Sequence, residues 1–181
     1  PDDRTVTGSY FPDFNWGINN RLTFKNIDFS FLIQGVEGNE ILNLTSRHMK
    51  NGEANFNSYA IFNERWRSPS EPGNGYMPRA DRQTGNHGNN NRPSSFQVED
   101  GSYVRLRNVT LGYTMPTDKF FGSKIQKLRF YVTGTNLFTI TDYLGYNPEV
   151  SSITTNSLTP GEDYGAFPLT KSFTLGINLK F

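Results

Sequence analysis

The sequence predicts an all-β protein, with about five strands from the C-terminal part of a transmembrane antiparallel β-barrel with long extracellular loops. The clearest observation is residues 170–181, where every second residue is apolar and those between are small or polar. A period of two puts the apolar residues on one face of a strand. A barrel wall needs an apolar face toward lipid and tolerates a wet inner face. The apolar residues of this strand are Phe173, Leu175, Ile177, Leu179 and Phe181.

Composition agrees with this prediction. Mean hydropathy is −0.62 and hydrophobic residues make up only 34%, but strands that alternate apolar and polar residues keep the average low in membrane barrels as well. No run of 18 or more apolar residues occurs, so no spanning helix is expected. Aromatic residues make up 14% of the chain, which suits β structure and the aromatic girdles of barrels.

Charge and cysteine content exclude several classes of function. The net charge of +1 gives no excess that would point to nucleic acid as a partner. The chain has no cysteine, which excludes a disulfide framework and a thiolate metal site.

The first two strands form a predicted hairpin. In residues 13–25, Phe14, Trp16, Ile18, Leu22 and Phe24 share one face. Residues 27–34 alternate in the same way, and the connection at Lys25-Asn26 is short enough for a tight turn.

Residues 35–101 differ in kind, because Gly, Asn, Ser and Pro crowd them. Two helical patches are predicted inside this stretch, at residues 40–50 and 54–66. More than sixty residues is too long for a passive connection, so we expect a functional, partner-binding or disordered loop.

The third strand is predicted at residues 102–115, the fourth at 127–141 and the last at 170–181, with a second long loop at 142–169. In the third strand the alternation slips, because Tyr103, Arg105 and Arg107 would join the apolar row. A bulge near Asn108, with the basic half reaching beyond the bilayer, would account for this slip.

Long and short connections alternate along the chain, as in outer-membrane barrels with short periplasmic turns and long external loops. Five strands cannot close a barrel and would leave two unpaired edges. We therefore expect the chain to be the end of a longer polypeptide, with Phe181 on the periplasmic side.

Several blocks, in order, resemble one family. They are DRTVTGSYFPDFNWGINN (3–20), RWRSP (65–69), PRA (78–80), DGSYVRLRNVTLGYTMP (100–116), LRFYVTGTNLFTIT (128–141), GYNPEVSS (145–152), DYGAFP (163–168) and the terminal TLGINLKF. Together they resemble the C-terminal end of SusC/RagA-type TonB-dependent transporters, and they span nearly the whole chain.

This resemblance implies an outer-membrane barrel of roughly 22 strands with a plugged lumen, to which residues 1–181 would contribute the last five. It implies a bacterial outer-membrane location, import of oligosaccharides or peptides, a SusD-like surface lipoprotein as partner, and energy from TonB. The plug and the TonB-contacting segment lie at the family's amino-terminal end, outside these blocks. Glycan and peptide importers share the blocks, so the substrate stays open.

Candidate contact residues for substrate or lipoprotein are aromatic, because aromatic rings can stack on sugars or grip peptide side chains. They lie in the two long loops, where they could equally pack the loops together: Trp66, Tyr76, Tyr146, Tyr164 and Phe167. The last strand, with its apolar row ending at Phe181, is the kind of signal that the outer-membrane assembly machinery recognises, although Phe181 could equally be a girdle aromatic.

Catalysis has little support, and no cofactor is expected. His48 and His87 lie far apart with no ligand partner at a metal-site spacing. The acidic pairs Asp2-Asp3, Glu99-Asp100 and Glu162-Asp163 are interpreted as solvated loop charges. Two alternatives remain: a soluble all-β carbohydrate-binding module, which would need a second sheet to cover these apolar faces, and a small secreted hydrolase, which lacks an acid/base constellation.

Overall fold

The computed structural model describes residues 4–50, 52, 57–80, 92–117, 125–150 and 160–181. The chain divides into two compact units. The sheet unit comprises residues 12–38, 102–142 and 168–181. The loop unit comprises residues 1–11, 39–101 and 143–167, so the two long connections of the sequence fold together. Among the described residues, no helix combines the length and the apolar character needed to cross a membrane.

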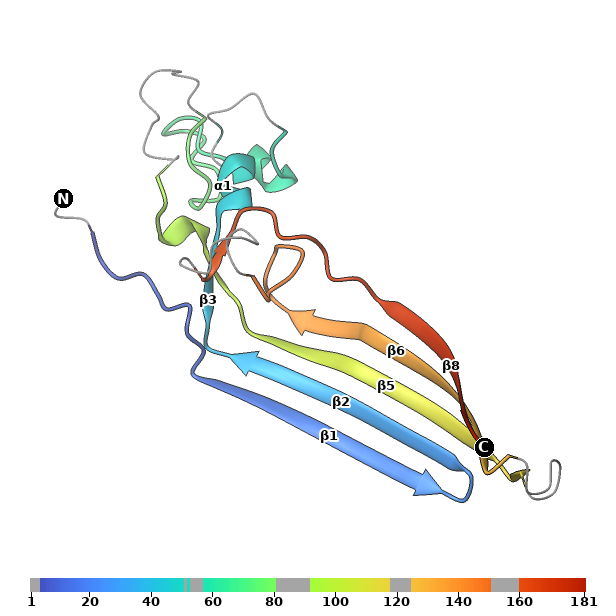
Figure 1. Cartoon of the computed structure of the whole chain (residues 1–181). Helices are drawn as coiled ribbons and strands as arrows, with labels where there is room; N and C mark the ends of the chain where they lie inside the picture. Colours follow the sequence, from blue (N-terminus) through green and yellow to red (C-terminus); the bar gives the residue numbers. More distant parts are fainter. Residues whose placement is uncertain (1–3, 51, 53–56, 81–91, 118–124, 151–159) are drawn as a thin grey trace. The chain divides into compact units, whose positions relative to one another are not determined.

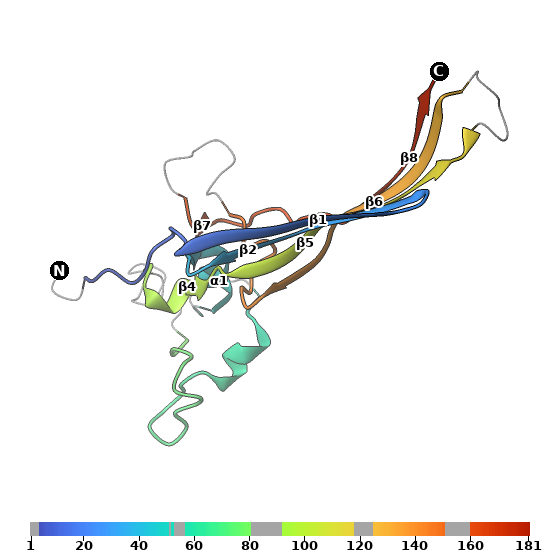
Figure 2. The ribbon, with the colours of Figure 1, turned by 90° about the horizontal axis from the view of Figure 1, so that it is seen from below.

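The sheet unit is one antiparallel sheet of five strands in the order β1-β2-β5-β6-β8 (Figure 1). Seen nearly edge-on, the strands form a single curved layer (Figure 2). Each strand lies within a few residues of its predicted position. Their bounds are Phe14–Phe24 for β1, Ile27–Glu37 for β2, Tyr103–Met115 for β5, Lys127–Thr141 for β6 and Ser172–Lys180 for β8.

One face of this sheet is apolar and exposed. The register places Leu22 opposite Phe29, and Phe29 opposite Leu111, so the apolar rows of successive strands coincide. The same row continues through Val132 to Leu175, whose side chain is 83% exposed. The exposed apolar residues of this face are Phe14, Ile18, Leu22, Phe24, Ile27, Leu111, Tyr113, Phe130, Phe138, Ile140, Phe173, Leu175, Ile177 and Leu179.

A bulge keeps the apolar face continuous. On the β2 side, Leu32 pairs with Asn108 and Ile33 pairs with Leu106, which leaves Arg107 as an extra residue on β5. On the β6 side, Leu106 pairs with Phe138 and Asn108 pairs with Thr135, so two residues of β6, Asn136 and Leu137, lie opposite Arg107. Asn136 has a φ of 53°, the left-handed conformation that Asn tolerates better than most residues. The predicted bulge near Asn108 is therefore confirmed, and it turns Tyr103 and Arg105 to the polar face.

The polar face carries hydroxyls and an ion pair that crosses a strand. The hydroxyl oxygens of Thr110 and Thr133 are 2.9 Å apart. Arg129 on β6 donates from Nε to Asp28 Oδ1 (2.8 Å) and from Nη2 to Asp28 Oδ2 (2.5 Å) on β2. Gly112 of β5 lies between them, and a Cβ there would come within 2.4 Å of the Arg129 Nη2 atom. The glycine thus makes room for the ion pair.

The loop unit contains a second, small sheet in the order β4-β3-β7, with bounds Val98–Asp100, Glu40–Asn43 and Glu162–Asp163. β3 pairs antiparallel with β4 and parallel with β7. In the described part of this unit, the other elements are the helix α1 (Leu44–Lys50) and the short 3-10 helices η1 (Ala60–Glu64) and η3 (Ser95–Gln97).

The helix predicted over residues 40–50 is wrong in its first four residues. Ile41 is fully buried, and residues 40–42 pair with β4, so tertiary pairing extends the backbone there. The second predicted helix, over residues 54–66, is reduced to the single 3-10 turn of η1, while residues 54–56 lie outside the described part.

Gly112→Ala is expected to destabilise the sheet unit by about 1–3 kcal/mol, because Arg129 must leave its bidentate position on Asp28 to admit the new Cβ. Thermal unfolding of the detergent-solubilised protein measures the effect. Gly17→Ala is the matched control, since a Cβ there meets only the Ile33 carbonyl oxygen at 3.6 Å. Equal midpoints for the two variants would contradict the role given to Gly112.

Candidate functional site

The candidate site lies in the loop unit, where β3 runs directly into α1. Asn43, at the junction, accepts a hydrogen bond from the Ser46 backbone N–H on its Oδ1 (2.8 Å) and one from the Ser46 hydroxyl on its backbone carbonyl (2.9 Å). An Asn in this position satisfies an otherwise unpaired N–H in the first turn of a helix. Both Asn43 and Ser46 are buried, so this junction is a fixed part of the unit.

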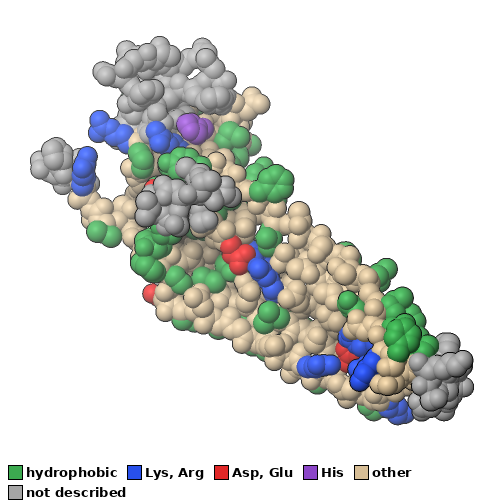
Figure 3. All heavy atoms as spheres, viewed as in Figure 1, with side chains coloured by type: hydrophobic (Ala, Val, Ile, Leu, Met, Phe, Trp, Pro, Cys, Tyr) green, Lys and Arg blue, Asp and Glu red, His purple; other side chains and the backbone are tan. Residues whose placement is uncertain are grey.

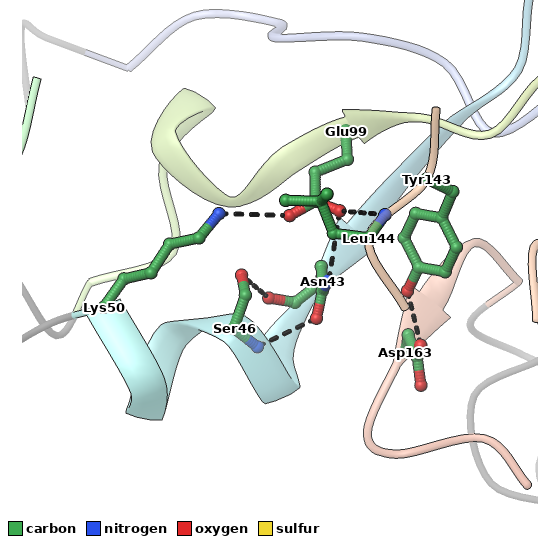
Figure 4. Close-up of polar contacts among 7 residues, drawn as sticks. All are labelled: Asn43, Ser46, Lys50, Glu99, Tyr143, Leu144 and Asp163. Atoms are coloured by element: carbon green, nitrogen blue, oxygen red, sulfur yellow. Dashed lines mark hydrogen bonds and ion pairs between the residues drawn. The ribbon is translucent and has the colours of Figure 1, made fainter. Parts of the chain in front are cut away.

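The Glu99 carboxylate joins three segments of the loop unit (Figure 4). Lys50 Nζ lies 3.3 Å from Oε1, while Asn43 Nδ2 and the Leu144 backbone N–H donate to Oε2 at 3.1 and 3.2 Å. The Lys50 and Glu99 side chains are only 6% and 12% exposed, and hydrogen bonds to charged groups are stronger than neutral ones when little water competes. Glu99 therefore ties the first long connection to the second.

Asp163 holds the second connection in shape. Its Oδ1 accepts from the backbone N–H groups of Gly165 and Ala166, both at 2.7 Å, and its Oδ2 accepts a short hydrogen bond from the Tyr143 hydroxyl. Asp163 is buried. The interpretation of Glu99 and Asp163 as solvated loop charges is wrong, because both carboxylates replace water with several protein donors. Asp2 and Asp3 lie outside the described residues.

Two tyrosines of this unit titrate above their ordinary range. Burial, followed by the hydrogen bond to Asp163, raises the pKa of the Tyr143 hydroxyl. Burial, followed by the negative charge of Glu99, raises the pKa of Tyr59. Both shifts favour the neutral phenol, since an ionised oxygen would face carboxylates at low dielectric.

An open pocket of about 500 Å³ lies beside α1. Leu44 and Met49 supply apolar surface, and Tyr164 supplies an aromatic ring. Thr45, His48 and Asn57 add polar groups, a combination usual in ligand-binding pockets. No group of three or more His, Asp or Glu side chains that could hold a metal ion occurs in the described part of the chain.

The five predicted aromatic contacts differ in their surroundings and in their exposure. Tyr164 lines the pocket. Tyr146 and Phe167 are 74% and 85% exposed. The Tyr76 ring is also exposed, and its centroid lies 4.8 Å from the centroid of the Phe96 ring. Trp66 is half-buried, and its backbone N–H donates to the Met77 carbonyl.

Sequence reasoning missed Leu44, Thr45, Met49 and Asn57, and it set His48 aside. The spacing of residues 44, 45, 48 and 49 on one face of a helix was the available signal. The sequence does not show what this face meets, because Asn57 and Tyr164 reach it only in the folded unit. His87, the other histidine, lies outside the described residues.

Comparison with known proteins identifies the relatives of this chain. TonB-dependent receptor P26 of Formosa agariphila is 38% identical over 183 residues, which cover 99% of this chain and 18% of that protein. TonB-dependent receptor P3 of the same organism is also 38% identical, with 99% and 17% covered. TonB-dependent receptor SusC of Bacteroides thetaiotaomicron is 26% identical, with 93% and 15% covered.

The chain is a relative of the TonB-dependent receptors. The resemblance to the SusC/RagA type is confirmed, since SusC itself is among the matches. The chain spans less than a fifth of the length of these relatives. No family model matches the sequence.

Solved structures show the same fold. The RagAB peptide transporter matches with a TM-score of 0.75 and 20% identity, covering 97% of this chain and 18% of that one. The RagAB peptide importer in its open-open state matches with a TM-score of 0.73 and 22% identity, with the same coverage. The predicted class, antiparallel strands of the kind that build these transporters, is confirmed.

The raised pKa of Tyr143 predicts that the stability of the loop unit depends on pH. Because its pKa is higher in the folded loop unit than in an unfolded chain, its contribution to stability is complete below about pH 10 and decreases as the pH rises further. We expect limited proteolysis of the two long connections to accelerate above that pH. Tyr143→Phe should flatten this rise, whereas Tyr146→Phe, which changes an exposed hydroxyl, should leave it intact. The same steep rise in Tyr143→Phe would refute the assignment.

Proposed function

We propose that this chain forms part of the wall and external loops of a TonB-dependent importer of oligosaccharides or peptides in the bacterial outer membrane. The observation that carries the proposal is the continuous apolar face of the sheet unit, which runs across all five strands and is exposed. Transferring one large apolar side chain out of water is worth about 1.5–3 kcal/mol, so fourteen such side chains strongly favour lipid over water.

The two outer strands support the same proposal. β1 and β8 are the edges of the sheet, and among the described strands each pairs on one side only. Long unpaired edges promote aggregation, and closure into a barrel is the arrangement that removes them. In the proposed protein, the rest of a longer chain supplies the neighbouring strands.

The loop unit is proposed to lie outside the membrane and to contact substrate. Its pocket combines the apolar side chains of Leu44 and Met49 with one aromatic ring and a few polar groups. We assign Tyr164 to substrate contact, and the strongly exposed Tyr146 and Phe167 to contact with substrate or with a SusD-like surface lipoprotein. The exposed Tyr76 and the half-buried Trp66 keep the assignment made from the sequence, which is contact with substrate or with the lipoprotein.

Energy coupling is proposed to come from TonB, through the part of the protein that this chain does not contain. The relatives carry TonB in their names, and they are five or more times longer than the matched segment. No catalytic role is proposed. The alternative of a soluble carbohydrate-binding module would leave the apolar face in water, because those side chains are exposed in the described residues.

Phe181→Ala in the full-length protein is expected to lower the amount found in the outer-membrane fraction, because it removes the last apolar residue of the proposed assembly signal. The measurement is the fraction that migrates as a compact, heat-modifiable band several times heavier than 20.6 kDa. Asn178→Ala on the polar face of β8 is the control. A soluble native chain of about the present mass would overturn the proposed function itself.

Tyr164→Ala is expected to weaken substrate binding by roughly 3–10-fold, because one aromatic contact is worth about 0.5–1.5 kcal/mol. Binding is measured by calorimetry on the purified full-length protein, with a panel of oligosaccharides and oligopeptides. Phe11→Ala is the control, since Phe11 is an exposed aromatic of the same unit that does not line the pocket and is not among the candidate contacts. An equal loss of affinity in both variants would contradict the assignment of the pocket to substrate binding.

A further inference from the structure

Parallel strand pairing brings two residues of the pocket together. β7 pairs with β3 in parallel, and the last pair of residues is Asp163 opposite Asn43. Both strands end there, and the residues that follow, Tyr164 and Leu44, both line the pocket. The pairing that forms the small sheet therefore brings an aromatic ring from the second long connection to the start of α1.

The chain turns directly after Tyr164, and Asp163 stabilises the turn. Gly165 has a φ of 101°, a conformation that glycine adopts much more readily than other residues. Asp163 Oδ1 accepts hydrogen bonds from the backbone N–H groups of Gly165 and Ala166. An Asp side chain that bonds the backbone two residues further on is a typical turn-forming group. Tyr164 lies inside this turn, so the turn sets the direction in which its side chain leaves the backbone.

The other oxygen of Asp163 anchors the turn to the rest of the loop unit. Oδ2 accepts the hydrogen bond from the Tyr143 hydroxyl, and both side chains are buried (Figure 4). The next residue, Leu144, donates its backbone N–H to Glu99, which also pairs with Lys50 of α1. The turn that carries the aromatic ring and the helix beside the pocket are therefore both fastened to one pair of adjacent residues.

The Tyr164 side chain depends on this backbone support. It is 62% exposed, and hydrophobic side chains reach the surface at several places in the loop unit (Figure 3). Among the described residues, no side-chain hydrogen bond and no contact with another aromatic ring holds it. Exposed side chains change rotamer within picoseconds to nanoseconds, so only the fixed backbone keeps this ring at the pocket.

We propose that Asp163 is a positioning residue, which holds Tyr164 as one wall of the pocket before substrate arrives. The inference rests on the proposed function, which assigns Tyr164 to substrate contact. A preformed wall favours binding, because less of the loop has to be ordered when substrate binds. Asp163 is itself buried, so it acts on affinity through Tyr164 and not by touching substrate.

Asp163→Ala in the full-length protein is the test, because it removes both acceptors of the turn and leaves Tyr164 in the chain. Affinity is measured by calorimetry with the panel of oligosaccharides and oligopeptides used for Tyr164→Ala. We expect the same loss of roughly 3–10-fold as in Tyr164→Ala. The double variant should lose no more than either single variant, because residues that act through one another are not additive.

Two further variants separate positioning from general damage to the loop unit. Asp163→Asn keeps an oxygen that can accept the two backbone N–H groups, so it should retain most of the affinity. Glu162→Ala is the matched control, since it removes the neighbouring carboxylate, which takes no part in the turn. If Asp163→Ala does not reach the outer membrane, Tyr143→Phe, which removes only the bond to Oδ2, takes its place under the same criteria.

A fluorine NMR spectrum of the full-length protein in detergent, with para-fluorophenylalanine in place of Tyr164, reports the ring without any substrate. A resonance that broadens or splits in Asp163→Ala, but not in Glu162→Ala, supports the positioning role. An unchanged resonance overturns it, as does a loss of affinity that adds to that of Tyr164→Ala. Full affinity in Asp163→Ala beside a loss in Tyr164→Ala overturns this inference alone, whereas full affinity in Tyr164→Ala also contradicts the pocket contact of the proposed function.

Discussion

The requirement that every strand keeps its apolar residues on the same face governs this structure. Strand pairing alone does not ensure it, because the side-chain period is two and a shift of one residue would exchange the faces. In β5 the alternation of the sequence is broken. Relative to β2, the extra residue Arg107 restores the alternation by moving Tyr103 and Arg105 to the polar face. Without this bulge, two cations would interrupt the surface that we assign to lipid.

The polar face is stabilised by hydrogen bonds and an ion pair instead of by apolar contact. Its rows are held by directional contacts: the hydroxyl pair of Thr110 and Thr133, and the ion pair that passes over Gly112. Directional contacts are compatible with a wet surface, since they tolerate water at their edges. They also fix register between β2 and β6, which do not pair with each other directly.

The loop unit shows how long connections become ordered. Glu99 receives donors from β3, α1 and the residues after β6, and Asp163 closes the turn that follows β7. Each carboxylate exchanges its water for charge-assisted hydrogen bonds, which makes the connections part of a folded unit. The pocket beside α1 exists because this network holds the helix and Tyr164 in place.

The sequence by itself determined the strands, their apolar faces, the bulge near Asn108 and the family, because these depend on local periodicity and on ordered blocks of residues. Only the tertiary structure decided that residues 40–43 are a strand, that Glu99 and Asp163 are enclosed, and that Tyr164 meets α1 at a pocket. These features arise between segments tens of residues apart. The pairing of Lys127 with Lys180 belongs to the same class, since only the register brings them side by side.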